Sequence, residues 1–231
     1  MISLRKSNAR GHFNHGWLDT FHTFSFADYY DPKFTHFRAL RVINEDRIAG
    51  GGGFGTHPHE NMEILTYVLE GSLEHRDSMG TGSVIRAGEL QKMSAGTGIT
   101  HSEANASRTD SVHLYQVWIF PKEKGLRPEY QQKSFAANSS ATGKLLKVAS
   151  QDGAEGSIIV HQDMNLYLCR PNGQMEYRNP ASRHAWVQIT RGRLQMGDQD
   201  LEAGDGLAIA GGERLLLQGA ADSEFMLFDL A

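Results

Sequence analysis

The sequences THPH at residues 56–59 and THSEAN at residues 100–105 decide how the rest of the chain is interpreted. Within them His57 and His59 are two residues apart, and so are His101 and Glu103. On a β-strand, residues i and i+2 point to the same face of the sheet. Two such pairs on neighbouring strands would direct three imidazoles and one carboxylate into one space. The spacing therefore has the outline of a metal site.

The residues around these pairs have the pattern of short β-strands. Strand-like runs at 63–69 and 83–86 are separated by glycines, and turn signals recur about every 8–12 residues, which favours an all-β sandwich or barrel over βαβ units. The strongest strand pattern is VHLYQVWIF at 112–120, rich in β-branched and aromatic residues. A further strand is predicted at 37–44, with the sequence NED at 44–46 as its turn.

A His-x-His pair alone is weak evidence for a metal site. The chain has 11 histidines in 231 residues. In a random chain of this composition, the expected number of His-x-His pairs is about one half. Two exposed turn histidines beside a proline are the structural alternative. The longer string is more specific, and it resembles the two signature motifs of the cupin superfamily. Its members are Gly51, His57, His59, Glu63 and Gly71, followed by Gly98, His101 and Asn105.

Several longer strings narrow the resemblance to the pirin family, and in particular to bacterial pirin-like quercetin 2,3-dioxygenases. They are HPH leading to MEILTY at 57–67, LEG at 69–71, EHRDS at 74–78, MSAGTGI at 93–99 before HSE, FSFADYY at 24–30 and PEYQ at 128–131. The resemblance covers about the first 135 residues. The chain departs from it at the glycine run 50–53 and at Gly96, where general cupins usually carry a proline.

The resemblance implies a ligand set and an activity. The family's metal ligands carry over to His57, His59, His101 and Glu103, with Glu103 also a candidate general base. The implied reaction is ring opening of a flavonol such as quercetin by dioxygen, with release of carbon monoxide. The implied small-molecule partners are therefore a flavonol and O2. A metal-binding regulator that acts through a protein partner is the alternative within the family, and a metal-assisted isomerase or sugar-modifying cupin is a third reading.

The donor types indicate the class of metal. Three neutral imidazoles and one carboxylate suit a single divalent first-row cation, and the absence of cysteine argues against a structural zinc site. Iron, manganese, nickel, copper, cobalt and zinc all remain compatible with these ligands. Glu63 is a rival carboxylate, because it occupies the place of the glutamate ligand in general cupins. In a straight strand it would stand about 13 Å from His59.

After residue 135 the chain repeats part of its pattern. Residues 68–73 (VLEGSL) are echoed by 189–194 (ITRGRL), and the sequence AGE at 87–89 by AGD at 203–205. These echoes predict a bicupin, two tandem double-stranded β-helix (jelly-roll) barrels, with domains at 1–135 and 136–231. The positions that match the ligands, near 179–184 and 214–218, carry no comparable histidines, so a metal site is expected only in the N-terminal barrel. Residues 122–143 are the predicted linker.

Composition excludes other classes of protein. The net charge is −4 with no basic run, which argues against a nucleic-acid partner. No apolar run approaches the 18 or more residues of a membrane span, and the single cysteine, Cys169, suits a reducing compartment as a small buried hydrophobe. We therefore expect a cytoplasmic protein that is a monomer and has no membrane partner.

Other histidines and glycines are given structural roles. His75 and His113 are interpreted as structural histidines, and the histidines before residue 37 as surface or packing residues within an aromatic segment that covers the barrel. A lining for a flat aromatic ligand is the functional alternative for this segment. The glycine run at 50–53 is expected to form a loop, either a plain turn or the mouth of a pocket.

Overall fold

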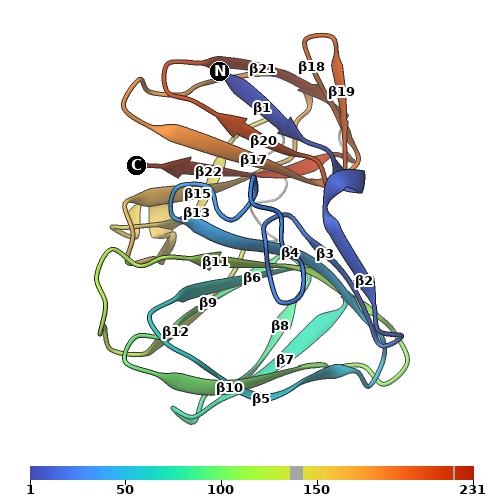
Figure 1. Ribbon diagram of the computed structural model, residues 1–231, viewed down its shortest axis with the longest axis vertical. Coiled ribbons are helices and arrows are strands. Elements are labelled where there is room, and N and C mark those ends of the chain that lie inside the picture. Colours follow the sequence, from blue (N-terminus) through green and yellow to red (C-terminus); the bar gives the residue numbers. More distant parts are fainter. Residues whose placement is uncertain (136–142, 221) are drawn as a thin grey trace. The chain divides into compact units, whose positions relative to one another are not determined.

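The computed structural model describes residues 1–135, 143–220 and 222–231, and these are mostly β-strand (Figure 1). The all-β prediction is confirmed. Contacts divide the chain into two compact units. The N-terminal barrel comprises Gly11–Ala136 and Val160–Gln162, and the C-terminal barrel comprises Met1–Arg10, Ala137–Ile159 and Asp163–Ala231. This division differs from the expected 1–135 and 136–231 chiefly in where it assigns the first ten residues.

The N-terminal barrel consists of two sheets. One has the strand order β12-β9-β6-β11-β4-β3-β2 and the other β5-β10-β7-β8. Their bounds are β2 Gly11–Asn14, β3 Leu18–His22, β4 Leu40–Ile48, β5 Gly53–His59, β6 Glu63–Glu70, β7 Ser72–Asp77, β8 Gly82–Arg86, β9 Glu89–Ser94, β10 Ile99–Asn105, β11 Val112–Ile119 and β12 Glu129–Ser134.

The C-terminal barrel repeats this plan. Its sheets have the orders β1-β20-β17-β22-β15-β13-β14 and β16-β21-β18-β19, so that β17 takes the place of β6, β21 that of β10 and β16 that of β5. The strands are β1 Ile2–Arg5, β13 Leu146–Ser150, β14 Ile158–Ile159, β15 Met164–Cys169, β16 Gly173–Arg178, β17 His184–Arg191, β18 Arg193–Met196, β19 Gln199–Glu202, β20 Gly206–Ile209, β21 Arg214–Gly219 and β22 Glu224–Leu230. Short 3-10 turns lie at Ser7–Ala9 and Ala154–Gly156.

The repeated glycines occupy equivalent turns in the two barrels. Gly71 between β6 and β7 has φ 74°, and Gly192 between β17 and β18 has φ 66°. The carbonyl of each accepts a hydrogen bond from an alanine N–H, Ala87 in one barrel and Ala203 in the other. These left-handed conformations favour glycine, because other residues there are strained. The sequence echoes therefore mark one turn built twice.

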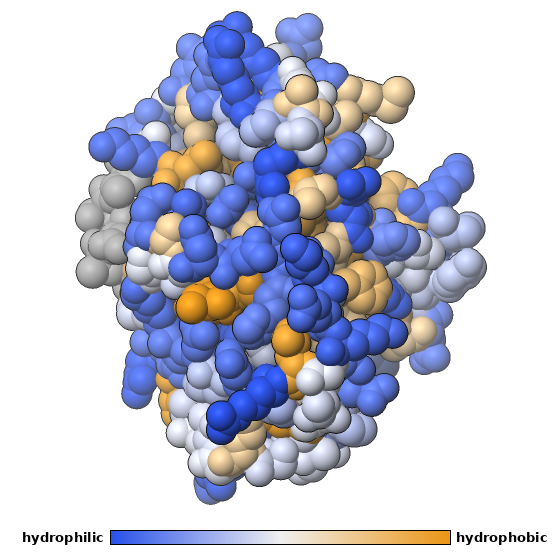
Figure 2. All heavy atoms as spheres, turned by 90° about the vertical axis from the view of Figure 1, so that its left-hand side faces the viewer, coloured by the Kyte–Doolittle hydropathy of each residue, from blue (hydrophilic) through white to orange (hydrophobic). Residues whose placement is uncertain are grey.

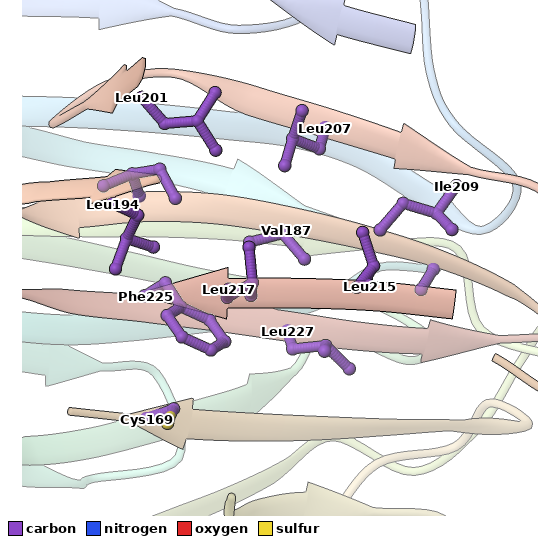
Figure 3. Packing of buried hydrophobic residues seen from close by; sticks show 12 residues of the cluster. Cys169, Val187, Leu194, Leu201, Leu207, Ile209, Leu215, Leu217, Phe225 and Leu227 are labelled. Carbon is purple, nitrogen blue, oxygen red and sulfur yellow. The ribbon is translucent and has the colours of Figure 1, made fainter. Parts of the chain in front are cut away.

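The interiors of the two barrels differ in polarity. A buried cluster in the C-terminal barrel joins Val187, Leu215, Leu217 and Phe225, with Cys169 at its edge (Figure 3). Leu215 and Leu217 lie on β21, the counterpart of the histidine-bearing β10. The counterpart of β5 is β16, slightly earlier in the chain than the predicted 179–184. On β21, apolar side chains thus take the place that polar side chains take on β10 of the N-terminal barrel.

Two predictions of local structure need correction. The sequence NED at 44–46 is no turn, because β4 continues through it to Ile48, with Asn44 and Asp46 buried. The predicted linker at 122–143 contains β12, which pairs along β9 from Glu129↔Ser94 to Ser134↔Glu89. Residues 136–142 of that linker lie outside the described residues. The other predicted strands, at 63–69, 83–86 and 112–120, correspond to β6, β8 and β11.

The distribution of apolar residues bears on whether the protein binds a membrane or a partner. Among the described residues, no helix is long and apolar enough to cross a membrane. On the face drawn in Figure 2, hydrophobic residues lie singly or in small groups among hydrophilic ones. Scattered apolar residues of this kind are ordinary on protein surfaces and do not by themselves indicate a binding surface.

Candidate metal centre

The strands β5 and β10 lie side by side and bring the two sequence pairs together (Figure 1). His57 lies opposite His101, and His59 lies opposite Ile99. The register shifts between His101 and Glu103, where β5 contains one extra residue. Burial alternates along β10, so His101 and Glu103 both point into the barrel. Side chains on β10 thus alternate between the two faces of the sheet, as the spacing of His101 and Glu103 predicted.

Three imidazoles converge at this point. The ring centroids of His57, His59 and His101 lie 4.4–4.9 Å from one another. Taking one possible ligand nitrogen from each ring, the three atoms lie within 4.8 Å of one another. The Nε2 atoms of His57 and His101 are 2.9 Å apart, and His57 Nδ1 lies 2.8 Å from the Gly55 carbonyl oxygen. A carbonyl only accepts, so Nδ1 of His57 carries the proton and its Nε2 presents a lone pair.

The electrostatics keep two of the imidazoles neutral. Burial, followed by the neighbouring His57, lowers the pKa of His59 to about 4 and that of His101 to about 3. A neutral imidazole is the form that binds a metal, because its unprotonated nitrogen is the ligand. At neutral pH His59 and His101 are therefore ready to act as ligands without first losing a proton.

Glu103 is buried beside these histidines. Its Oε2 accepts a hydrogen bond of 2.8 Å from Gln116 Nε2, whereas its Oε1 is buried with no hydrogen-bond partner. Burial raises the pKa of Glu103 to about 7. Glu103 forms a second close group with His101 and His75, so His101 is shared by both groups. Each of the four predicted residues thus belongs to one of two close groups among the described residues, and His101 belongs to both.

The donor set fits a divalent cation. The Nε2 lone pair of His57 faces His101 Nε2 at 2.9 Å, so a proton or a cation must lie between the two nitrogens. Burying the carboxylate of Glu103 is costly unless a partner replaces its lost hydration. A divalent cation would serve the imidazoles and stabilise the nearby carboxylate, and both ligand types suit first-row metals. The expected single divalent cofactor therefore matches the residues present.

A cavity of about 310 Å³ opens onto this group. His57, His59 and Glu103 lie on its lining, together with aromatic side chains that include Phe26, Phe54 and Trp118. The Trp118 ring stands at 87° to the His59 ring with centroids 4.9 Å apart. A cavity of this size, mostly apolar with a few polar groups, is typical of a small-molecule site.

The N-terminal segment contributes to this cavity. His15, His22 and Asp46 line it, whereas the sequence predicted only surface or packing roles for the two histidines. Burial raises the pKa of Asp46 to about 7, and the Thr20 hydroxyl donates a hydrogen bond to its carboxyl group. The functional alternative for the aromatic segment, a lining for a flat ligand, agrees with this arrangement. No short sequence motif marks these residues, because they reach the cavity through the pairing of β3 with β4.

Glu63, the rival carboxylate, lies in a different environment. It is buried at the start of β6, and its Oε2 is 3.8 Å from Lys92 Nζ. The backbone N–H of His161 also donates to it, at 3.2 Å. It belongs to neither of the close groups found among the described residues. The charged partner of Glu63 is therefore the buried ammonium group of Lys92, and not the histidine cluster.

Sequence reasoning missed the part played by His75. This fully buried residue pairs through Nε2 with Asp77 Oδ2 at 3.0 Å, and its Nδ1 lies 3.4 Å from His101 Nδ1. The signal was available, since Asp77 is two residues after His75 and therefore on the same strand face. Gln116 and Trp118 show the same spacing on β11, and the Trp118 indole donates to Gln116 Oε1 at 3.1 Å.

Comparison with known proteins places the chain in a family. A model described as Pirin matches residues 3–119, and a model described as Quercetinase C-terminal cupin domain matches residues 147–230. The chain belongs to the pirin family. The predicted bicupin architecture of this pirin is thereby confirmed.

Individual pirin relatives are similar over the full length. The protein named Quercetin 2,3-dioxygenase from Escherichia coli (strain K12) is 53% identical over 232 residues, covering 100% of this chain and 99% of that protein. The crystal structure of YhhW from Escherichia coli has a TM-score of 0.94 at 52% identity and covers 100% of this chain and 98% of that chain. The structure of the bacterial pirin YhhW in complex with nickel(II) has a TM-score of 0.93 at 51% identity, covering 100% and 99%.

Proposed function

We propose that this pirin is a metal-dependent quercetin 2,3-dioxygenase that opens the central ring of a flavonol with O2 and releases carbon monoxide. The observation that carries the proposal is the cavity of about 310 Å³, which is lined by three of the four candidate ligands and by aromatic side chains. The name of the 53% identical relative supports the same reaction. We further propose His57, His59, His101 and Glu103 as the ligands of one divalent cation, and the nickel(II) complex of the relative supports such a site.

The cavity suits a flat polyphenol. Phe26 and Trp118 meet edge to face at 86°, with ring centroids 5.2 Å apart, and both line the cavity. Aromatic walls of this kind bind a planar ring system by burying its faces. Asp46, on the same lining, offers a hydrogen-bonding group for a phenolic hydroxyl. We infer that the flavonol lies with its rings against Trp118 and its 3-hydroxyl toward Glu103.

Glu103 is the proposed general base. When bound, the divalent cation supplies Lewis acidity that lowers the pKa of the 3-hydroxyl. Glu103, whose carboxylate form the bound cation would stabilise, accepts the hydroxyl proton. Gln116 holds Oε2 of Glu103 from one side, and Trp118 in turn holds Gln116. This chain of hydrogen bonds limits movement of the carboxylate.

Oxygen uptake tests the proposal directly. Purified protein is loaded separately with each candidate divalent metal, and O2 consumption and CO release are measured after quercetin is added. We expect equal amounts of O2 consumed and CO released in at least one metal form. A His57→Ala variant is expected to lose this activity, because one imidazole of the cluster is gone. His36→Ala, which alters an exposed histidine outside the cavity lining, serves as the matched control.

Absence of uptake in every metal form would overturn the proposed reaction. Tight binding of a protein partner by the metal-loaded protein, without quercetin turnover, would instead favour the regulatory alternative. The monomeric state and the cytoplasmic location stay predictions, and size-exclusion chromatography with light scattering tests the first of them.

A further inference from the structure

Behind His101, on the side away from His57, lies a buried pair that the proposed reaction does not use. His75 and Asp77 are both on β7, which pairs with β10 so that His75 lies opposite Glu103 and Asp77 opposite His101. The side chains of both members of the pair are 0% exposed. Burying a histidine and a carboxylate together is costly unless their hydrogen bonds are all formed. The hydrogen bonds around this pair therefore indicate which ring nitrogen of His75 carries the proton.

The carboxyl group of Asp77 is held in place by the backbone. Its Oδ1 accepts hydrogen bonds from the N–H groups of Met79 at 2.9 Å and Thr81 at 3.0 Å. Its Oδ2 faces His75 Nε2 at 3.0 Å. A carboxylate only accepts, so the Nε2 atom of His75 carries the proton. In the neutral ring, Nδ1 of His75 is then an acceptor.

Two groups point at that acceptor nitrogen. The Gln91 side-chain amide donates to His75 Nδ1 at 3.3 Å, and His101 Nδ1 lies 3.4 Å away from the same atom. The Tyr130 ring packs against the His75 ring with centroids 5.0 Å apart, which limits rotation of the imidazole. The lone pair of His75 Nδ1 favours a proton on the facing His101 Nδ1. A cation bound by the Nε2 atoms of His101 and His57, which are 2.9 Å apart, requires the same tautomer of His101.

We propose that Asp77 and His75 are positioning residues that fix the tautomer of His101, so that His101 presents Nε2 to the divalent cation. The inference rests on the proposed metal site. Metal-binding histidines commonly depend on a partner of this kind at their other nitrogen, and loss of the partner typically reduces metal affinity about 10–100-fold. Here the partner is another histidine, whose own tautomer is set by Asp77.

Asp77→Asn is the decisive variant. The asparagine oxygen can still accept from Met79 and Thr81, but its amide now donates toward His75 Nε2. His75 must then carry its proton on Nδ1, and His101 must move its proton to Nε2, the nitrogen intended for the cation. We expect Ni²⁺ affinity, measured by competition with a chromophoric chelator, to fall about 10–100-fold.

A double-mutant cycle separates this role from a structural one. His75→Asn places an amide oxygen near the position of Nδ1, where it can accept from His101 without help from Asp77. We expect Asp77→Asn to cause no further loss of Ni²⁺ affinity in the His75→Asn background, because the link from Asp77 to His101 is already absent there. Glu45→Gln is the matched control, since His113 Nε2 pairs with Glu45 Oε1 at 3.0 Å in the same barrel.

Nitrogen-15 NMR of protein loaded with diamagnetic Zn²⁺ reads the tautomers without any substrate. In the wild-type protein we expect the proton on Nε2 in His75 and on Nδ1 in His101, and in Asp77→Asn we expect the proton of His75 on Nδ1. A wild-type His101 protonated on Nε2, or an Asp77→Asn variant with unchanged tautomers and Ni²⁺ affinity within twofold of wild type, would refute the proposal. Correct tautomers in a protein that binds Ni²⁺ but does not oxidise quercetin would count against the proposed function alone.

Discussion

At the scale of single residues, the candidate site combines groups whose protonation is set by burial. His59 and His101 are neutral at pH 7 because burial lowers the pKa of each imidazole, while burial raises the pKa of Glu103 to about 7. The same low-dielectric surroundings thus favour the uncharged form of an imidazole and of a carboxyl group. A bound cation would reverse this preference for Glu103, since a positive charge stabilises the carboxylate.

Glu103→Gln is expected to separate metal binding from turnover. The three imidazoles remain, so most of the metal content is retained, as measured by elemental analysis. The amide cannot accept the hydroxyl proton, so we expect quercetin turnover to fall about 10²–10⁴-fold. Glu63→Gln is the control for metal content, because Glu63 faces Lys92 rather than the histidines. Turnover by Glu103→Gln equal to that of wild type would exclude the role of base.

Cys169 is expected to be chemically inert in the folded protein. Its side chain is 1% exposed, and burial, followed by the charge of Glu224, raises its thiol pKa to about 12. Because the thiolate is the reactive form, the native protein should not react with Ellman's reagent at pH 8. One equivalent should react after unfolding in guanidinium chloride. Rapid labelling of the native protein would contradict the buried position of the thiol.

At the scale of elements, the site depends on how closely β5 approaches β10. A Cβ atom at Gly53 would lie 2.6 Å from the backbone oxygen of Glu103 and 2.7 Å from the Cα of Ala104. Gly55, on the same strand, has open space at the equivalent point. The glycine at 53 therefore lets the two ligand-bearing strands pair closely, which the length of the glycine run did not reveal.

Gly53→Ala is expected to weaken metal binding by pushing β5 away from β10. A shift of the strand moves His57 and His59 relative to His101, so Ni²⁺ affinity should fall at least about tenfold, since loss of ligand positioning has effects of this size. Gly55→Ala should bind Ni²⁺ like wild type, because its added methyl group meets no atom and its carbonyl still accepts from His57. Equal affinities for the two variants would show that the close approach at Gly53 is unimportant for the site.

The failed turn prediction at 44–46 is also explained at this scale. Three consecutive polar residues usually mark a loop, because buried polar groups are costly. In β4 the first and third of them, Asn44 and Asp46, face the cavity, and Asp46 receives a hydrogen bond from Thr20. A strand that directs polar side chains into a cavity can therefore have the local composition of a turn.

At the scale of the whole molecule, one plan of strands is used twice with different interiors. The N-terminal barrel places histidines on β5 and β10, whereas the C-terminal barrel places apolar residues on β16 and β21. The apolar interior gains stability from burial, at roughly 25 cal/mol per Å² of apolar surface. The N-terminal barrel gives up part of that gain for polar side chains, which a bound cation would stabilise.

Metal removal is therefore expected to destabilise the N-terminal barrel selectively. A cation at about 100 times its Kd adds about 2.7 kcal/mol to the free energy of unfolding. Treatment with a chelator should lower the melting temperature and increase hydrogen exchange in β5 and β10. Exchange in β17 and β22 is expected to stay unchanged. An equal increase in both barrels would contradict a metal site confined to the N-terminal one.

The sequence by itself determined the features that depend on local period and on repeated turns. His57 with His59, and His101 with Glu103, share strand faces because side chains alternate along a strand. The echo of Gly71 in Gly192 revealed the second barrel, because each glycine has a left-handed conformation that other residues rarely adopt. Each such signal is contained in a short stretch of sequence and can be recognised without knowing which strands are neighbours.

Only the tertiary structure decided which strands are neighbours. The pairing of β7 with β10 brings Asp77 and His75 to the back of His101, and the pairing of β3 with β4 brings His22 to the cavity. The pairing of β1 with β20 assigns the first residues to the C-terminal barrel. Register between strands far apart in sequence is set by the packing of the whole barrel, because many side chains must be buried at once.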